Sequence, residues 1–285
     1  MQKLSIQSLI QNFYSSHIDD PIRNRFKSWE HCHKAFIEAH KKGYENLNED
    51  DIKLLCLHLS FCLASFGMYR GSSFLIESDY LANKSVVELI FEPIYEPLWD
   101  FNPANSDINL AHELLFNETF GVYNRIKNDC YLDSDYLIVI EDNKKISKRK
   151  ANKPSSILIT KILMITFGCI PAFDTLVSKT IGPNPKKIFR AICEYVKTDP
   201  GNFVCKSNDV YYPPMRCLDI LLWCLGYVSE EIKNYHKKSI NKDKLIDELN
   251  DFGIFSVEIT NKNVNLLVDQ IQGIINRIPK KESQK

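Results

Sequence analysis

The sequence predicts a mainly α-helical protein with minor β elements. Apolar residues recur at three- and four-residue steps along much of the chain, and several apolar runs have helical length. Glycine and proline stand between these runs, where helices are expected to end. Apolar residues make up 44% and charged residues 25% of the 285 residues, so the chain can bury a core as soluble globular proteins do.

Four helices are expected before residue 130. In the first, Phe26, Trp29 and Cys32 begin an apolar stripe that Gly43 ends. Three acidic residues open the second, where they interact favourably with the helix dipole. Prolines at 93 and 97 should kink or shorten the third. The four ranges are 24–42, 49–68, 84–99 and 108–126, and the run YLIVI at 136–140 is a candidate strand.

The second half of the chain continues the helical pattern. Pro154 opens a helix, Ile170-Pro171 breaks the chain, and Gly182-Pro183 stops the helix that follows. The alternating segment FSVEIT, at 255–260, predicts a strand beside the last helix. The expected helices are 155–167, 174–181, 185–197, 215–225 and 263–278.

We expect three sequence segments that together form one compact, two-lobed unit. They are an acidic helical part at 1–143, a helical part with the candidate catalytic segment at 144–228, and a C-terminal appendage at 229–285. The longest apolar run, 54–69, is too short to span a bilayer, and the N-terminus lacks the features of a secretory signal. The expectations are therefore no membrane association and a cytoplasmic location.

The nine cysteines form no CxxC pair and lie mostly in apolar runs, so we expect small core side chains in a reducing compartment. His31-Cys32-His33 is the nearest approach to a ligand cluster. Adjacent positions on a helix point in different directions, so these residues are interpreted as an ordinary helix face. No metal and no cofactor are predicted.

Net charge is zero, but the two halves of the chain are opposite in charge. Residues 1–143 hold 12 Lys+Arg and 22 Asp+Glu, whereas residues 144–285 hold 24 and 14. Six cations lie within 144–153 without an acid, and a second basic group comprises Lys179, Lys186, Lys187 and Arg190. Such blocks often bind polyanions, although a solvated loop and an exposed helix face would show the same pattern.

Common catalytic and nucleotide-binding signatures are absent: there is no GxxxxGK[ST], GxGxxG, GxSxG or HExxH. Three local patterns remain, at 65–73, 160–174 and 212–223. In the middle pattern a buried helix carrying Lys161 runs into Gly168 and Pro171, and Asp174 opens the next helix. Asp is a favoured N-cap. A carboxylate fixed at a helix start can also stabilise the oxocarbenium-like state of glycosidic bond cleavage.

The order of a buried helix, Ile-Pro-Ala-Phe-Asp and a further helix resembles the catalytic segment of the helix-hairpin-helix DNA glycosylase superfamily, especially its divergent bacterial members. The resemblance covers about 50–226 and is most specific at 160–182. It implies that Asp174 is the catalytic carboxylate, and Asp174 and Lys161 are the two predicted catalytic residues. Lys161 matches the helix lysine of the divergent members but not the spacing of the lyase lysine, which implies a monofunctional enzyme.

This resemblance also implies how DNA is held. The expected Gly-rich hairpin is replaced by Asn-Lys-Pro-Ser-Ser at 152–156, so phosphates would be bound by the hydroxyls, the helix start behind them and the basic residues. The target nucleotide must be flipped out of the duplex into a pocket. The predicted phosphate-binding residues are Lys148, Arg149, Lys150, Lys153, Ser155, Ser156, Lys179, Lys186 and Lys187, and the predicted base pocket is Tyr69, Arg70, Ser72 and Ser73.

Each of these assignments has a structural alternative. Arg70 could pair with an acid of the first half, and Gly67 and Gly71 could serve close packing. Trp223 and Tyr212 are interpreted as core residues. Asp219 lies in an apolar run and needs a partner if it is buried, for which a structural salt bridge is the expected solution.

The first hypothesis is a DNA glycosylase that extrudes a damaged or modified base from double-stranded DNA and hydrolyses its N-glycosidic bond. The resemblance further implies a place in antiphage defence, since phage DNA carries modified bases. The alternatives are a non-enzymatic helical nucleic-acid-binding protein and a helical protein-interaction module. No obligate protein partner is evident from the sequence.

Overall fold

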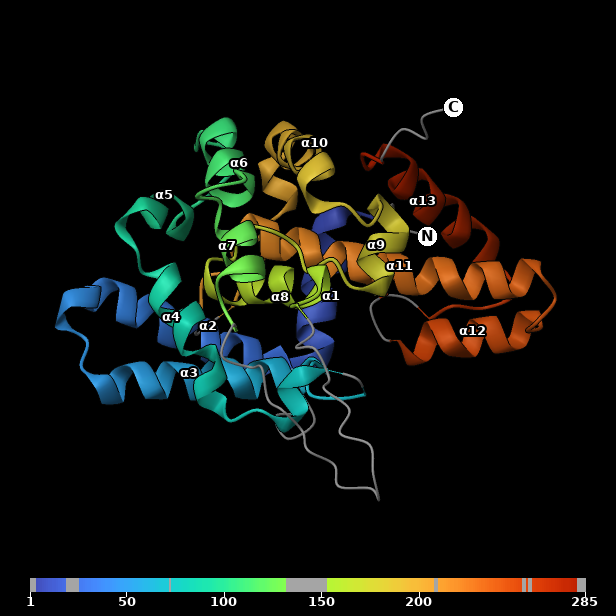
Figure 1. Cartoon of the computed structure of the whole chain (residues 1–285). Coiled ribbons are helices and arrows are strands. Elements are labelled where there is room, and N and C mark those ends of the chain that lie inside the picture. Colours follow the sequence, from blue (N-terminus) through green and yellow to red (C-terminus); the bar gives the residue numbers. More distant parts are fainter. Residues whose placement is uncertain are drawn as a thin grey trace, which may run out of the picture.

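The computed structural model describes residues 4–18, 26–71, 73–131, 153–207, 210–252, 255 and 258–280, and within them all regular secondary structure is helical. The predicted all-α class is confirmed for these residues (Figure 1). The α-helices are α1 (Ile6–Ile18), α2 (Phe26–Lys42), α3 (Glu49–Ser65), α4 (Lys84–Ile90), α5 (Glu96–Trp99), α6 (Ile108–Phe116), α7 (Val122–Asn128), α8 (Ser156–Thr166), α9 (Thr175–Ile181), α10 (Pro185–Thr198), α11 (Pro214–His236), α12 (Lys242–Asp251) and α13 (Val264–Arg277).

The predicted strand FSVEIT is wrong where it can be judged, since residues 255 and 258–260 are not in a strand. Instead, the Asn250 side chain forms hydrogen bonds with both backbone polar groups of Ile259. Ile259 N donates to Asn250 Oδ1 at 2.7 Å, and Asn250 Nδ2 donates to the Ile259 carbonyl at 2.9 Å. A side chain therefore takes the place of a neighbouring strand. The second predicted strand, 136–140, lies outside the described residues.

Several helix boundaries differ from the prediction because of local polar groups. The single helix expected at 84–99 is divided in two. Helix α4 ends at Ile90, and a 3-10 turn that begins at Pro93 leads into α5. The expected helix at 108–126 breaks after α6, where Asn117 Oδ1 accepts from Thr119 N and Phe120 N. Helix α11 extends to His236, beyond the predicted end at 225. Helices α1 and α12 were not predicted from periodicity.

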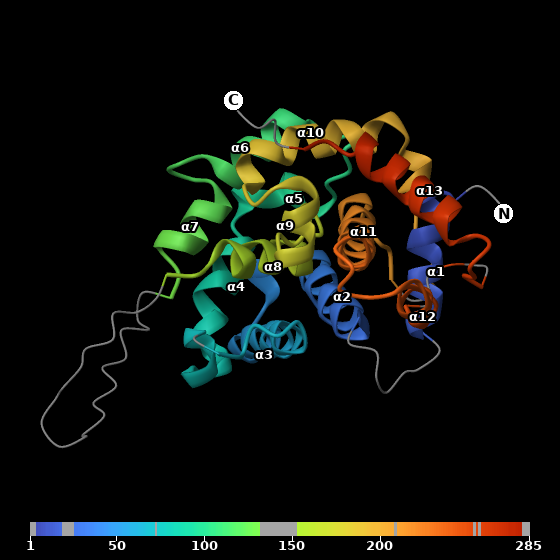
Figure 2. The same ribbon diagram turned by 90° about the vertical axis from the view of Figure 1, so that its right-hand side faces the viewer.

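Helix α8 lies near the middle of the molecule in both views (Figures 1 and 2). Every residue from Leu158 to Thr166 is buried, and α2, α3 and α7 pack against it. A helix that is apolar on all sides needs such enclosure. Its first turn is capped by Ser155, whose Oγ accepts from Leu158 N at 3.2 Å.

The other end of α8 depends on two ring side chains of α2. Trp29 Nε1 donates to the Met164 carbonyl at 3.2 Å, and His33 Nδ1 bonds the Ile165 carbonyl at 3.0 Å. The two rings stack with centroids 4.6 Å apart and planes 15° apart. The last carbonyls of a helix have no intrahelical donor, so α2 supplies the donors that this buried end requires.

Helix α1 joins the beginning of the chain to its later part. It packs against α11, where the rings of Phe13 and Trp223 lie 5.7 Å apart, and Leu4 N donates to Gln270 Oε1 at 2.9 Å. Helices α9 and α11 also lie close together, because Gly226 leaves room for the Leu176 backbone. Among the described residues, helices from all three segments therefore pack against one another.

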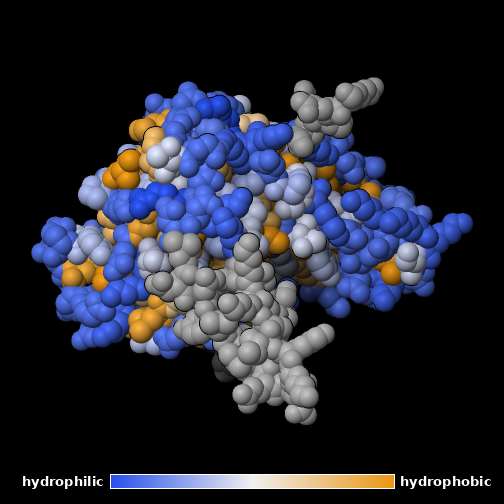
Figure 3. All heavy atoms as spheres, viewed as in Figure 1, coloured by the Kyte–Doolittle hydropathy of each residue, from blue (hydrophilic) through white to orange (hydrophobic). Residues whose placement is uncertain are grey.

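The nine cysteines are buried and free, as predicted. Within the described residues, no helix has the length and apolarity needed to cross a bilayer. The face shown in Figure 3 is mostly hydrophilic, with apolar side chains scattered over it.

The buried His33 predicts a specific pH dependence of stability. Burial lowers its pKa from 6.5 to about 4, so the unfolded chain takes up a proton before the folded chain does. The stabilisation by neutral His33 is complete above pH 6.5 and is lost as pH falls toward 4, by roughly 3 kcal/mol. Urea unfolding of wild type and His33→Gln at pH 7 and pH 4.5 should show a smaller acid loss in the variant. Equal losses would contradict this assignment.

Candidate functional site

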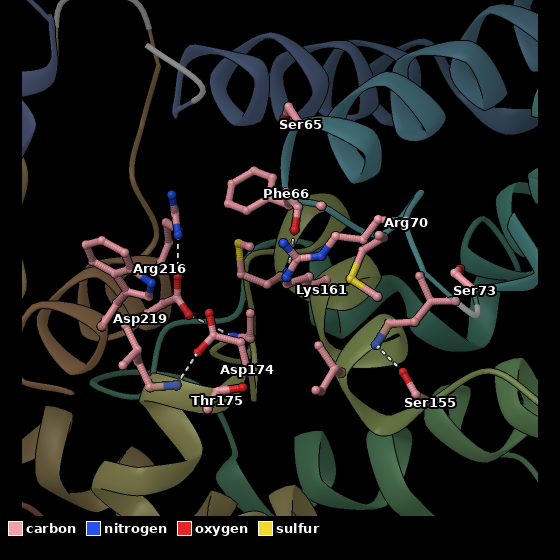
Figure 4. Close-up of a pocket in the computed structure, with 18 of the residues that line it drawn as sticks. Ser65, Phe66, Arg70, Ser73, Ser155, Lys161, Asp174, Thr175, Arg216 and Asp219 are labelled. Carbon is pink, nitrogen blue, oxygen red and sulfur yellow. Dashed lines mark hydrogen bonds and ion pairs between the residues drawn. The ribbon is translucent and has the colours of Figure 1, made fainter. Parts of the chain in front are cut away.

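A cavity of about 740 Å³ lies between the end of α3, helix α8, the start of α9 and helix α11 (Figure 4). This volume is in the range of small-molecule sites. All three sequence patterns contribute to its wall: 65–73 supplies Arg70, 160–174 supplies Lys161 and Asp174, and 212–223 supplies Asp219 and Trp223. Residues that are far apart in the sequence therefore meet at one site.

Lys161 is a buried cation in the cavity wall. Its side chain leaves α8, and Nζ donates to the Phe66 carbonyl at 2.8 Å. Nζ also lies 5.7 Å from the centroid of the Phe66 ring. A buried ammonium is costly unless it is partnered, and here the carbonyl at the C-terminal end of α3 and an aromatic face supply partners. Lys161 thereby ties the end of α3 to α8.

Asp174 is the N-cap of α9, as the sequence predicted. Its Oδ1 accepts hydrogen bonds from Leu176 N and Val177 N, both at 3.0 Å. Both bonds use the same carboxylate oxygen, and no group of the described residues donates a hydrogen bond to Oδ2. The side chain is half-buried and lines the cavity. One oxygen is thus committed to the helix start, while the other is left for a ligand.

Asp219 has the salt-bridge partner that the sequence required. Arg216 Nη1 donates to Asp219 Oδ2, and Ala172 N donates to Asp219 Oδ1 at 2.8 Å. Asp219 is 5% exposed and Arg216 2% exposed. Burial raises the pKa of Asp219 to about 6, with a further increase from the nearby Asp174 and an opposing effect of Arg216. The Ala172 bond fixes the backbone two residues before Asp174.

Arg216 was not singled out by the sequence analysis. Its guanidinium carbon lies 4.9 Å from the centroid of the Trp29 ring, and the side chain lines the cavity. Nε and Nη2 are buried and have no hydrogen-bond partner among the described residues. The spacing of Arg216 and Asp219, three residues apart on one helix face, is the signal that could have identified the pair.

The predicted base-pocket residues are only partly brought together. Arg70 and Ser73 line the cavity, and none of the ion pairs between described residues includes Arg70. Ser73 also caps a 3-10 turn, since its Oγ accepts from Leu75 N. Tyr69 does not line the cavity, and its buried hydroxyl has no partner among the described groups. Ser72 lies outside the described residues.

Among the predicted phosphate-binding residues, Lys153 and Ser155 line the cavity. Lys153 Nζ donates to Asn128 Oδ1 at 3.3 Å, and Ser155 is the α8 N-cap. The Ser156 hydroxyl is buried, without a partner in the described part of the chain, and does not line the cavity. Lys148, Arg149 and Lys150 lie outside the described residues.

The second basic group is largely engaged with acidic residues. Lys179 pairs with Glu230 at 2.9 Å, Lys186 with Glu118 and Arg190 with Glu113 at 3.9 Å, whereas Lys187 is exposed. The pairs of Lys186 and Arg190 join the basic half to the acidic half. Exposed ion pairs of this kind contribute little to stability.

The two aromatic side chains that the sequence assigned to the core differ in their surroundings. Tyr212 is buried, and its hydroxyl donates to Glu30 Oε1 at 2.8 Å. Trp223 is only half-buried and lines the cavity, which corrects its assignment as a core residue. Its ring contacts Phe13 on α1 and Tyr227 on the next turn of α11. The cavity therefore has an aromatic wall on the α11 side.

Within the described residues, no three His, Cys, Asp or Glu side chains are grouped to hold a metal ion. No family model, curated protein or solved structure matches this chain.

The Arg216–Asp219 pair predicts a non-additive effect on stability. Arg216→Met should lower the free energy of unfolding at pH 7.5 by about 3–5 kcal/mol, because it leaves the Asp219 carboxylate buried and unpaired. Arg216→Met combined with Asp219→Asn should recover most of this loss, since Asn remains an acceptor for Ala172 N. Urea unfolding of the two single variants and the double variant measures the coupling. A double variant no more stable than Arg216→Met would refute it.

Proposed function

We propose that this protein is a DNA glycosylase that flips a damaged or modified base out of double-stranded DNA and hydrolyses its N-glycosidic bond. The observation that carries the proposal is the Asp174 carboxylate. It is fixed at the start of α9 through Oδ1, and it lines a cavity of about 740 Å³ that can hold a nucleotide. The resemblance of the segment around 160–182 to helix-hairpin-helix DNA glycosylases supports the same reaction.

The proposed step follows from the charge that develops on the sugar. As the bond between C1′ and the base nitrogen breaks, its electron pair leaves with the base and the sugar becomes oxocarbenium-like. Asp174 Oδ2 stabilises this positive charge and orients a water molecule toward C1′. The water oxygen then forms the new bond to C1′, its proton is released, and the departing base is protonated. The two backbone donors at Oδ1 hold the carboxylate in place throughout.

The surroundings of Lys161 favour hydrolysis without lyase activity. A lyase lysine attacks C1′ with a free amine, but Lys161 Nζ is bonded to the Phe66 carbonyl and is buried. Breaking that bond would leave a buried carbonyl without a donor. We therefore assign Lys161 a positioning role, in which it holds Phe66 at the cavity and adds positive charge to the wall.

The cavity also carries groups suited to the DNA backbone. Arg70 is exposed beside the end of α3, and Lys153 and Ser155 lie at the start of α8. Cations and hydroxyls at a helix start bind phosphates without reading sequence. A role in defence against phage DNA with modified bases belongs to this proposal through the family resemblance.

Two substitutions of Asp174 separate catalysis from capping. Asp174→Asn keeps an N-cap oxygen and should leave the free energy of unfolding nearly unchanged, while Asp174→Ala should lower it by about 1 kcal/mol. Both should reduce base release from modified DNA by at least roughly 100-fold, because both remove the negative charge. Base release is measured by mass spectrometry on a panel of normal and modified duplexes, and stability by urea unfolding.

The alternatives predict different results in the same experiment. If the carboxylate were only a cap, Asp174→Asn would release base as wild type does. A non-enzymatic nucleic-acid-binding protein would retain DNA at low salt and release no base with any variant. A protein-interaction module would neither retain DNA at low salt nor release base.

A further inference from the structure

The Arg216 guanidinium has a pair of donors that the described protein does not use. Nη1 is engaged by Asp219, whereas Nε and Nη2 are buried without a hydrogen-bond partner in the described residues. The side chain is 2% exposed and lines the cavity. Nε–H and one Nη2–H lie on the same edge of the planar group and point in the same direction. This edge matches two acceptor atoms that are neighbours on a ligand.

The edge is held rigidly. One face of the guanidinium lies over the Trp29 ring at 4.9 Å, and Trp29 is itself fixed by its bond to the Met164 carbonyl. Asp219 holds the opposite side of the group and is fixed by Ala172 N. A donor pair fixed before the ligand arrives loses little freedom on binding, so it can discriminate between ligands.

The local charge favours a neutral ligand edge over an anion. Asp219 balances the charge of Arg216, and Asp174 lines the same cavity, close enough to add to the rise in the pKa of Asp219. A phosphate or carboxylate seated on the Arg216 edge would lie near these two carboxylates. A nucleobase edge brings two acceptors without that repulsion.

We infer that Arg216 is a specificity-determining residue that selects a guanine- or cytosine-derived base through two adjacent acceptors. Guanine presents N7 and O6 as neighbouring acceptors, and cytosine presents N3 and O2. Adenine and thymine alternate donors and acceptors along their edges, so one donor of Arg216 would face another donor. The inference rests on the proposed function in that it names the substrate class of the same site.

Binding of mononucleotides to the wild-type protein tests the inference directly. Isothermal titration calorimetry with dGMP, dCMP, dAMP and TMP should show that dGMP, dCMP or both bind roughly 10- to 100-fold more tightly than dAMP and TMP. Replacing one acceptor should remove that advantage. The probes are 7-deaza-dGMP, which lacks N7, and 3-deaza-dCMP, which lacks N3. The deaza analogue that loses affinity identifies the preferred base.

Equal affinity for the four nucleotides, no binding of any of them, or no loss with the deaza analogues would overturn the inference. Arg216→Lys keeps a cation beside Asp219 but lacks the paired donors, so it should abolish the preference. Arg277→Lys, at an exposed position in the last turn of α13, is the matched control and should keep it. The deaza comparison uses unaltered protein, so it decides the question even if Arg216→Lys fails to fold.

Failure of the nucleotide-binding test can be distinguished from failure of the proposed glycosylase activity. Base release that persists without any nucleotide preference would leave the glycosylase proposal standing and remove the role of Arg216. A preference that depends on Arg216, in a protein that releases no base, would leave the binding site standing and remove the catalytic proposal.

Discussion

The burial of α8 from Leu158 to Thr166 is the constraint on which the remaining structure depends. A helix with no exposed face gains much from apolar contacts, but its polar groups must find partners inside the protein. Neighbouring elements supply them: Ser155 caps the first turn, Trp29 and His33 donate to the last carbonyls, and Lys161 reaches the Phe66 carbonyl. Each of these bonds fixes an element that borders the cavity.

Hydrogen bonds from α8 and α11 also fix the backbone that leads to the candidate catalytic carboxylate. Thr160, on α8, accepts a hydrogen bond from Phe173 N at 3.0 Å, and Asp219, on α11, accepts one from Ala172 N at 2.8 Å. The two residues before Asp174 are therefore held from two sides. The chain then enters α9 with the Asp174 carboxylate fixed by two backbone donors. Precise placement of such a group is what stabilisation of a developing charge requires.

Much of this arrangement could be predicted from local sequence. The α8 helix, the Gly and Pro break, and Asp174 as an N-cap each depend on short-range patterns, and the structure has all three. The cost of an isolated buried charge also predicted that Asp219, if buried, would form a salt bridge, and Arg216 supplies it. The electrostatic opposition of the two halves was visible in the composition, but composition does not show that Lys186 and Arg190 pair with acids of the first half.

What could not be predicted depends on tertiary contacts. The Asn250 side chain replaces the partner strand that FSVEIT would need, and no local pattern indicates this. The spacing of Arg216 and Asp219 is visible in the sequence, but the two free donors of Arg216 and its contact with the Trp29 ring are not. Trp223 shows a similar limit, because an apolar helix predicts burial but not which turn borders a cavity.

The central claim is that Asp174 stabilises positive charge on a sugar in this cavity, and affinity for a charged sugar mimic tests it most directly. The measurement compares duplexes that carry at one position either a cationic pyrrolidine abasic analogue or its neutral tetrahydrofuran counterpart. Wild type should bind the cationic duplex at least about tenfold more tightly than the neutral one, and Asp174→Asn should bind the two equally. Equal binding by wild type, or a preference retained by Asp174→Asn, would contradict the account.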